Sequence, residues 1–483
     1  MTACVVMFPG QGAYFPGALA PLADDEPLVH ETLRTLDAAA VRLGRTAPSR
    51  LLLDDRAPAL AELVETAPAD LHAALFAAGT ALFRVLTERH GLRPAVLLGH
   101  SFGELVALTA AGVYDPADGM ALAAARDEAF AACPPEPGGM VALSLSAART
   151  EGLLLALGAW EVVLAADNGP RQCVVSGPAG PLERVRAAAE ALGVGATPLR
   201  VPHAFHHRSL AAVADDFARR AAALRARPAR HPLHSAILGR RLDDGDAVAE
   251  LVAAHLVRPT RFADAVRALH AGGADLFVEC GPRGTLSDLV AATVPGVRTV
   301  APLRRRADGR EVADALAEAL RRAGTGTLDG GAAALPLPSV PKPTPTPTPK
   351  PKPEPKPEPE PWSAYESVPT AVPGPRDAYQ GGPPGPGGGR LADRRAVVET
   401  LRALYADALG YPPEVLTGDA DLEADLGVDS IKQTELFARA VTHYGRTLPP
   451  DGSRLTGHTT LDALAGLLAS LPADGARTTG AAS

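Results

Sequence analysis

A proline-rich run in the last third of the chain sets the strongest limit on how this chain can fold. Proline is nearly alternating over residues 336–361, where Thr-Pro pairs give way to Lys-Pro and Glu-Pro pairs. Proline fixes φ and has no backbone N–H, so the run can join neither a helix nor the interior of a sheet. We expect an extended polyproline II spacer. At about 3.1 Å per residue, the spacer could reach roughly 80 Å.

The spacer divides the chain into two candidate working units. Glycine-rich residues 362–390 continue it as a softer tether, and we set the whole linker at 324–392. Residues 1–323 then form a first domain, residues 393–475 a second domain, and residues 476–483 a short tail. A ligand for a proline-binding partner is the alternative interpretation of the run, and we favour the spacer between two domains.

The first domain has the pattern of an α/β protein. Apolar runs such as 4–8, 95–99 and 275–280 alternate with alanine- and leucine-rich stretches. This alternation predicts strands separated by helices in a mostly parallel sheet. From about 137 to 200, short strand-like runs lie close together around helical stretches. That segment suits a small α+β subdomain inserted into the larger sheet.

The second domain has the pattern of a small helical bundle. Residues 394–409 and 430–444 are amphipathic, and residues 459–471 predict a third helix. Short loops rich in Gly, Pro and Asp connect these segments. We therefore expect a separate all-α bundle of three or four helices.

Charge and cysteine usage narrow the setting in which such a protein works. The 483 residues carry a net charge of −8 and show no basic patch, so nucleic acid and anionic membranes are not expected partners. The N-terminus predicts a strand and no signal peptide, and no apolar run is long enough to cross a bilayer. We expect a cytoplasmic protein without a metal site. Its four cysteines lack metal-ligand or disulfide spacing, which fits a reducing compartment: Cys4, Cys133, Cys173 and Cys280.

The sharpest chemical signal is the segment Ala95–Glu104, with the sequence AVLLGHSFGE. An apolar run leads into Ser101 between two glycines, and an apolar helical stretch follows. A strand, a turn and a helix in this order form a nucleophile elbow, in which the turn holds the serine oxygen clear of the backbone. The alternative is a glycine-rich turn with an incidental serine. We favour the nucleophile because both flanking elements are present.

A serine nucleophile needs a base to take its proton and donors to stabilise an oxyanion. The candidates for the base are three histidines in five positions, His203, His206 and His207, and the residues alone do not say which one acts. Their alternative is a loop that is partly exposed and partly supports the site. A zinc site is disfavoured because no carboxylate or cysteine lies nearby. The segment Phe8–Gly12, FPGQG, follows the first strand, where a backbone N–H could face a bound carbonyl.

Arg126 is a charged residue in the otherwise apolar segment Leu122–Arg126. A buried arginine needs an anionic partner, and a bidentate clamp on a substrate carboxylate would supply one. A surface salt bridge is the alternative. The sequence pattern does not decide between them.

These segments together resemble the acyltransferase family, which includes malonyl-CoA:acyl carrier protein transacylases and the acyltransferase domains of polyketide synthases. The resemblance covers residues 1–323 and implies an acyltransferase α/β-hydrolase-like core with an inserted small ferredoxin-like α+β subdomain. Its ordered motifs are FPGQG, GHSFGE, the arginine at 126, ADNGPRQCVVSG ending at 177, HAFH at 203–206 and VECGPRGTL at 278–286.

The resemblance assigns roles to individual residues of this sequence. Ser101 matches the acylated nucleophile of the family, and His206 matches its base. Gln11 and Phe102 match the positions whose backbone N–H groups form the oxyanion hole. Arg126 matches the clamp for the free carboxylate of a malonyl-type group.

Other matched positions concern support and selectivity. Asn168 matches a structural asparagine. The family orients its histidine through a backbone carbonyl. We assign this orienting role to Arg261. His203 and Phe205 lie in HAFH, which resembles malonyl-selective domains, and the bulky Phe102 leaves little room for an α-methyl group. One methyl is worth only about 1–3 kcal/mol of discrimination, so we expect selectivity for malonyl that is incomplete.

The second sharp signal is Asp421–Ile431, with the sequence DLEADLGVDSI. Ser430 begins a predicted helix there, and Ser430 with Gln433 makes a capping-box pattern, so a helix cap is the plain interpretation. Residues 394–472 also resemble an acyl carrier protein, which implies 4′-phosphopantetheine on Ser430. A phosphodiester suits a helix N-terminus because that end favours anions. Acidic residues nearby suit docking onto basic partner surfaces: Asp419, Asp421, Glu423, Asp425, Asp429 and Glu435.

Together the two resemblances imply a transfer reaction. Ser101 would take malonyl from malonyl-CoA by ping-pong catalysis and pass it to a phosphopantetheine thiol, on Ser430 or on a separate carrier, in polyketide or polyunsaturated-fatty-acid-type synthesis. The expected partners are a phosphopantetheinyl transferase, a ketosynthase and other synthase components. Two rivals stay open: an acyl hydrolase that clears wrongly loaded carriers, and an inert carrier and docking protein. Arg126 speaks against the first. The intact Ser101, His206 and Gln11 speak against the second.

Overall fold

The computed structural model describes most of the first predicted domain and parts of the second. The predicted linker at 324–392 and the tail at 476–483 lie outside the described residues. The described residues are 3–243, 245–321, 394–409, 416–419, 421–422, 428, 430–446 and 459–471.

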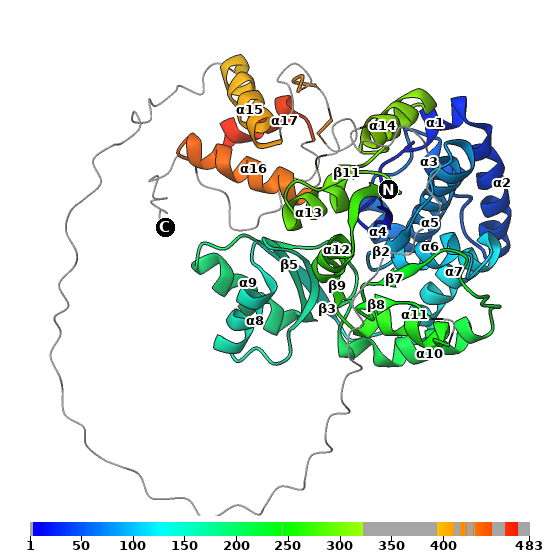
Figure 1. The fold of residues 1–483 in the computed structure, drawn as a ribbon. Coiled ribbons are helices and arrows are strands. Elements are labelled where there is room, and N and C mark those ends of the chain that lie inside the picture. The colour runs from blue at the N-terminus through cyan, green and yellow to red at the C-terminus, as the bar shows by residue number, and fades with distance from the viewer. Residues whose placement is uncertain are drawn as a thin grey trace, which may run out of the picture. The chain divides into compact units, whose positions relative to one another are not determined.

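A six-stranded sheet forms the middle of the first region (Figure 1). Its strands are β1 (Ala3–Phe8), β2 (Val96–Gly99), β7 (Leu233–Ser235), β8 (Arg240–Arg241), β10 (Ala274–Glu279) and β11 (Arg298–Val300). They lie in the order β11-β10-β1-β2-β7-β8, and every pair is parallel except β7 and β8. The predicted α/β class with a mostly parallel sheet is confirmed.

Helices cover both faces of this sheet. They are α1 (Ala20–Asp25), α2 (Pro27–Arg42), α3 (Ser49–Leu52), α4 (Leu60–Thr66), α5 (Pro68–Arg84), α6 (Gly103–Ala110), α7 (Pro116–Ala132), α10 (Ala211–Ala222), α11 (Val248–Val257), α12 (Phe262–Ala271), α13 (Thr285–Thr293) and α14 (Gly309–Arg321), with a π-helical turn η1 (Val85–Arg89) and a 3-10 turn η2 (Arg208–Leu210). Val6 and Phe8 of β1 share a core with α5, α6 and α7, whereas Val5 and Met7 pack with α12 and α13. A strand that is apolar on both sides requires such a helical layer on each face.

A second, smaller sheet belongs to an inserted segment. The segment runs through β3 (Gly138–Leu143), α8 (Ala147–Ala156), β4 (Val163–Gly169), β5 (Gln172–Pro178), α9 (Ala179–Ala191) and β6 (Ala196–Pro198). Its strands lie in the order β6-β3-β5-β4 with antiparallel neighbours, which is a ferredoxin-like arrangement. A fifth strand, β9 (Thr260–Arg261), comes from the larger part and pairs in parallel with β4. The predicted small inserted subdomain is confirmed.

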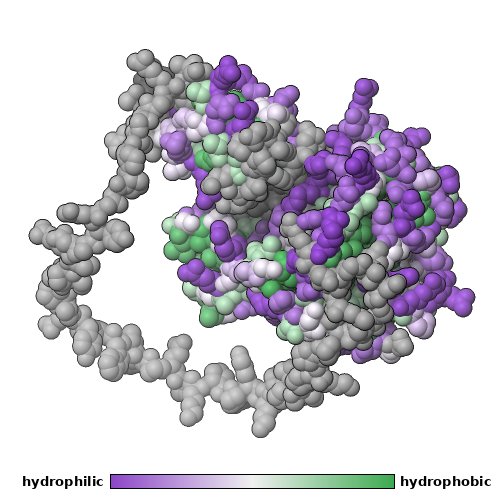
Figure 2. Space-filling model, turned by 45° about the horizontal axis from the view of Figure 1, so that its top comes forward, coloured by the Kyte–Doolittle hydropathy of each residue, from purple (hydrophilic) through white to green (hydrophobic). Residues whose placement is uncertain are grey.

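One helical stretch among the described residues, Pro68–Arg89, has the length and apolar composition of a membrane-crossing helix. It comprises α5 and η1, and 83% of its apolar window is buried inside the protein. A helix that is apolar all round and buried in this way is a core helix of a folded domain. The face in Figure 2 is hydrophilic over most of the coloured surface, with smaller hydrophobic areas.

The C-terminal region has a hydrophobic core of its own. Its described helices are α15 (Arg394–Leu409), α16 (Ser430–His443) and α17 (Leu461–Ser470), which confirms the helices predicted there. Leu401, Leu436 and Leu464, one from each helix, are fully buried in this core. Thr460 caps α17, since its hydroxyl accepts a hydrogen bond from the backbone N–H of Ala463 at 3.2 Å.

Candidate active site

Ser101 lies at the tight turn between β2 and α6. Its φ is +52°, a left-handed conformation that is uncommon for a residue with a side chain. The flanking glycines are required by close backbone contacts. A Cβ at Gly99 would lie 2.3 Å from Glu104 Cα, and a Cβ at Gly103 would lie 2.0 Å from Phe8 O. The strand, turn and helix therefore form an elbow that presents the serine hydroxyl.

His206 is the histidine that reaches this hydroxyl. Its Nε2 lies 2.9 Å from Ser101 Oγ, and its Nδ1 lies 2.8 Å from the backbone carbonyl of Arg258. A carbonyl only accepts, so Nδ1 carries the proton and the lone pair of Nε2 faces the hydroxyl. Burial lowers the pKa of His206 to about 4, with the Arg258 carbonyl opposing that shift. The imidazole is therefore neutral at neutral pH and available as a base.

The carbonyl that orients His206 belongs to Arg258, so the assignment to Arg261 is wrong. Arg258 follows the last residue of α11 in an extended conformation, and its carbonyl is not used by that helix. Arg261 lies in β9, where its backbone N–H donates to Ala236 O at 3.0 Å. Its side chain is 52% exposed. The sequence analysis assigned the carbonyl to the wrong residue of one short segment, because every residue has a backbone carbonyl and the sequence does not distinguish them.

The other two histidines of the cluster have different surroundings. His207 is buried and accepts at Nδ1 from the backbone N–H of Ser209 (3.1 Å), while its Nε2 donates to Glu161 O (3.1 Å). His203 stacks on Phe130 with ring centres 4.5 Å apart and 6° between the planes. His207 holds the turn after His206, and His203 packs among aromatic side chains.

Arg126 is buried, with 3% of its side chain exposed. Its Nε donates to His255 Nε2 at 3.3 Å. Burial lowers the pKa of Arg126 to about 10, so the guanidinium stays charged at neutral pH. The alternative of a surface salt bridge is wrong. The guanidinium carbon lies 4.9–5.8 Å from the centres of three aromatic rings: Phe102, Phe130 and Phe205.

His255 is a site residue that the sequence analysis missed. Its Nδ1 contacts the carbonyl of Val252, so Nδ1–H donates there and Nε2 accepts from Arg126. Burial, and then the charge of Arg126, lower the pKa of His255 well below its usual range. The neutral ring can therefore hold the arginine without repelling it. The available signal was a single imidazole in an apolar helical stretch, which is usually only a core histidine.

Gln11 and Phe102 lie in neighbouring loops at the same edge of the large sheet. Strands β1 and β2 are parallel with Phe8 opposite Gly99, so the loops that follow them emerge side by side. Within the described part of the chain, the backbone N–H groups of Gln11 and Phe102 have no hydrogen-bond acceptor. Two such free donors beside a serine hydroxyl are suited to an oxyanion.

Two protein-family models match this chain. The acyl transferase domain matches residues 5–327, and the phosphopantetheine attachment site matches residues 399–468. The first match covers more than half of the chain. The chain belongs to the acyl transferase domain family. Its C-terminal region matches a phosphopantetheine attachment site.

The relatives to which this chain is similar are polyketide synthases that are much longer than the chain. The chain is 38% identical over 290 residues to the spectinabilin polyketide synthase system protein NorB of Streptomyces orinoci, which covers 59% of the chain and 13% of that protein. It is 35% identical over 315 residues to the phenolphthiocerol synthesis polyketide synthase type I Pks15/1 of Mycobacterium marinum, covering 64% of the chain and 14% of that protein. The chain thus spans a small part of the length of these relatives.

Solved structures share the acyltransferase fold. An acyltransferase domain from the second module of the salinomycin polyketide synthase matches with a TM-score of 0.58 and 32% identity, over 66% of the chain and 73% of that structure. The malonyl-CoA:acyl carrier protein transacylase of Xanthomonas oryzae pv. oryzae matches with a TM-score of 0.58 and 30% identity, over 66% of the chain and 99% of that structure.

Asn168 of the acyltransferase region supports the elbow from the small sheet. Its Oδ1 accepts from His100 Nε2 at 2.7 Å, and its Nδ2 donates to Gln172 Oε1 at 3.0 Å. His100 immediately precedes Ser101. The small subdomain therefore helps to fix the turn that carries the serine.

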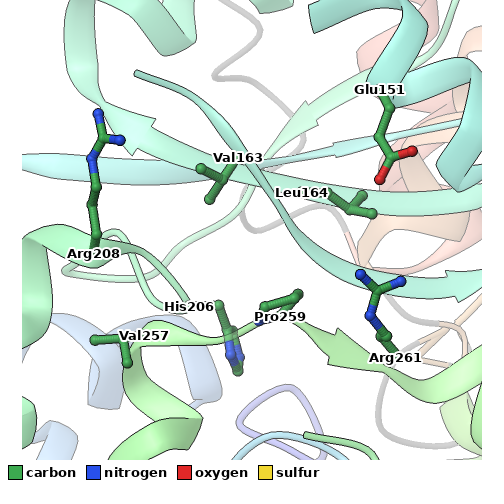
Figure 3. A pocket seen from close by; sticks show the side chains of 8 residues that line it. All are labelled: Glu151, Val163, Leu164, His206, Arg208, Val257, Pro259 and Arg261. Atoms are coloured by element: carbon green, nitrogen blue, oxygen red, sulfur yellow. The ribbon is translucent and has the colours of Figure 1, made fainter. Parts of the chain in front are cut away.

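A pocket of about 300 Å³ opens beside His206 (Figure 3). Figure 3 shows Arg208 and Arg261 on either side of it with His206 between them, so two cations flank the approach to the base. Its lining residues are Glu151, Val163, Leu164, His206, Arg208, Val257, Pro259 and Arg261. Across the part of the chain that the structure describes, no group of three His, Cys, Asp or Glu side chains is placed to hold a metal ion.

Ser430 is the first residue of α16, and its side chain lies outside the described residues. The amide of Gln433, its expected partner in a capping box, donates to Val428 O at 2.8 Å. The backbone N–H of Val428 in turn donates to Leu422 O at 2.7 Å. The segment before the helix is thus tied to α16. Parts of the predicted acidic docking face also lie outside the described residues: Glu423, Asp425, Asp429 and the side chain of Glu435.

Proposed function

We propose that this chain moves a malonyl-type group from coenzyme A to a phosphopantetheine thiol by way of Ser101. The observation that carries the proposal is the buried, charged guanidinium of Arg126 close to the Ser101–His206 pair. Its charge acts on His206, and its guanidinium carbon lies 5.8 Å from the ring centre of the residue after the serine, Phe102. A serine and a base alone suit any acyl group. A buried cation beside them suits an acyl group that carries a negative charge, because such a group would lie against the guanidinium.

In the first half-reaction, Ser101 Oγ bonds to the thioester carbonyl carbon while its proton moves to His206 Nε2. The carbonyl oxygen becomes an oxyanion, which the backbone N–H groups of Gln11 and Phe102 stabilise. The C–S bond then breaks, and His206 returns the proton to the leaving coenzyme A sulfur. The product is an acyl ester on Ser101, with its free carboxylate on Arg126.

In the second half-reaction, an acceptor thiol gives its proton to His206 and its sulfur attacks the ester. The C–O bond to Ser101 breaks, and the hydroxyl recovers the proton from His206. A phosphopantetheine group supplies such a thiol on a flexible arm when bound to a carrier. Ser430 fits this group because it begins α16, and a helix N-terminus favours a phosphodiester.

We assign malonyl as the preferred acyl group from the crowding around Arg126. Phe102, Phe130 and Phe205 surround the guanidinium, and His203 stacks on Phe130 and meets Phe205 edge-on at 5.8 Å. These rings limit the space for a branch on the carbon between the two carbonyl groups. Because one methyl is worth about 1–3 kcal/mol, the enzyme should favour malonyl over methylmalonyl without excluding it.

We also propose the organisation in which this reaction takes place. Residues 1–323 form the acyltransferase domain, 324–392 a spacer, 393–475 the carrier domain and 476–483 a tail. The family matches at 5–327 and 399–468 support this division. A phosphopantetheinyl transferase would modify Ser430, and a ketosynthase would consume the loaded carrier. The described cysteines are all free, which supports a cytoplasmic setting.

Mass spectrometry after labelling tests the proposal. The phosphopantetheinylated chain is incubated with labelled malonyl-CoA, and mass is followed on the peptides of Ser101 and Ser430. We expect malonyl first on Ser101 and then on the arm at Ser430, and no arm labelling in a Ser101→Ala variant. Absence of malonyl from both peptides would refute the proposal and leave an inert carrier protein. Rapid release of free malonate from Ser101, with no loading of any carrier, would identify a hydrolase.

A further inference from the structure

One buried histidine outside the catalytic pair contacts several parts of the site. His72 lies near the start of α5 and is 5% exposed. Its Nε2 contacts the side-chain nitrogen of Gln11, its Nδ1 lies 2.7 Å from Asp127 Oδ1, and its ring stacks on Phe102. The stacked rings have centres 5.1 Å apart and 22° between their planes. The mechanism above makes no use of this residue.

The contacts of His72 fix where its proton lies. An amide nitrogen can only donate, so the Gln11 side chain donates to Nε2. The proton is then on Nδ1, which donates to the carboxylate of Asp127. Asp127 is itself held by cations, with Arg126 Nη1 at 3.7 Å and Arg45 Nη2 at 3.9 Å. The imidazole is therefore hydrogen-bonded to a carboxylate through Nδ1 and to the side chain of Gln11 through Nε2.

We propose that His72 is a positioning residue that holds both halves of the oxyanion hole. Gln11 and Phe102 come from different loops, and His72 is in contact with the side chain of each. It fastens the first by a hydrogen bond and the second by a ring stack, so one side chain sets the spacing of the two backbone donors. This inference rests on the proposed function, because it takes the roles of Gln11 and Phe102 from it.

The link through Asp127 also connects this support to the carboxylate clamp. Asp127 and Arg126 are neighbours on α7, and the carboxylate of Asp127 is shared among His72, Arg45 and Arg126. A carboxylate with three partners competes less strongly for Arg126 than one with a single partner. His72 thus helps to leave the guanidinium available to the acyl carboxylate.

The test compares two substitutions that treat the contacts differently. His72→Phe keeps an aromatic ring to stack on Phe102 but removes both hydrogen bonds. His72→Gln removes the ring and keeps a side chain that can donate and accept. His30→Phe is the matched control, since His30 is exposed on α2. Each full-length variant is assayed for the rate of Ser101 acylation by malonyl-CoA and by acetyl-CoA, and its melting temperature is measured.

We expect His72→Phe to lower kcat about 10- to 100-fold with both acyl donors, because a displaced donor loses most of its effect on the transition state. His72→Gln should recover at least a third of the wild-type kcat, and His30→Phe should match wild type. A kcat within twofold of wild type for His72→Phe would overturn the inference. A larger loss in His72→Gln than in His72→Phe would also overturn it, because the hydrogen bonds that Gln can keep would then matter less than the ring stack that Phe keeps.

A second readout separates this inference from the proposed function. A fluorophosphonate probe reacts with an activated serine and places an oxyanion-like oxygen in the same hole, without needing a malonyl group. We expect His72→Phe to slow probe labelling of Ser101 at least tenfold. If the wild type reacts with the probe but never with malonyl-CoA, and His72→Phe slows the probe reaction, the proposed substrate is wrong while the role of His72 stands. If labelling is as fast in His72→Phe as in wild type, the role of His72 is wrong.

Discussion

Ser101 and Ser430 both stand near the start of a helix, yet the fold gives them different chemistry. Ser101 lies two residues before α6 with a φ of +52°, and His206 Nε2 lies 2.9 Å from its hydroxyl. Ser430 is the first residue of α16, and Gln433 of that helix ties it to the preceding Val428. The first serine can form its own ester because a base is held against it. In the proposed function, the second is modified by another enzyme.

The comparison shows that the chemistry of each serine depends little on the residue type and mostly on the groups that the fold places around it. His206 has a φ of +61°, so Ser101 and His206 both adopt a conformation that costs about 1–3 kcal/mol at each residue. The surrounding packing of the first region has to offset this strain. A helix N-terminus offers an anion a favourable place without such strain, which suits a site that is only a point of attachment.

The largest effect should follow from removing the base-activated serine. In Ser101→Ala we expect acyl transfer from malonyl-CoA to fall by at least about 10⁴-fold, as is typical when a catalytic serine is removed. Radiolabel transfer to the phosphopantetheinylated chain measures this rate. Ser144→Ala, which alters an exposed serine of the inserted segment, is the control. Transfer that survives in Ser101→Ala would show that the comparison of the two serines is misplaced.

The next largest effect concerns Arg126, the cation that we propose selects acyl groups with a free carboxylate. Arg126→Ala should lower the ratio of kcat/KM for malonyl-CoA to that for acetyl-CoA about 10- to 100-fold, because a hydrogen-bonded charge pair contributes about 1.5–3 kcal/mol. Arg126→Lys should fall between wild type and Arg126→Ala, because an ammonium cannot bind a carboxylate bidentately. An unchanged ratio in both variants would contradict the clamp.

The sequence predicted the fold and the serine of the site better than it predicted the residues that hold the site in place. The alternating runs predicted the parallel sheet, and the elbow pattern located Ser101 because two glycines are needed for its turn. Arg258 was missed because a backbone carbonyl can belong to any residue. His255 and Asp127 were missed because their roles depend on which helices pack together. Burial of Arg126 was undecided for the same reason.

A change of pH should affect the acylation of Ser101, which depends on neutral His206. We expect a smaller effect on this rate than the substitutions above produce. Burial lowers the pKa of His206 to about 4, so the neutral base persists as the pH falls from 8 to about 5, and activity is lost only on further acidification. The readout is kcat/KM for Ser101 acylation by acetyl-pantetheine, an uncharged thioester, at pH values where the fold is intact. An acid limb centred near pH 6.5 would show that His206 is less desolvated than its surroundings indicate.

The smallest effect should come from Arg208 and Arg261, the two arginines beside the pocket at His206. Arg208 and Arg261 are exposed, so each should add only about 0.2–1 kcal/mol to the binding of a phosphate on the incoming arm. We expect Arg208→Ala and Arg261→Ala each to raise KM for malonyl-CoA about two- to fivefold with kcat unchanged. Acetyl-pantetheine, which has no phosphate, should be unaffected, and added salt should reduce the difference because it screens exposed charges.

Arg310→Ala, which removes an exposed arginine on α14, is the control for surface charge. An equal rise in KM for acetyl-pantetheine would mean that the substitutions disturb the pocket itself and that the arginines do not read the phosphate.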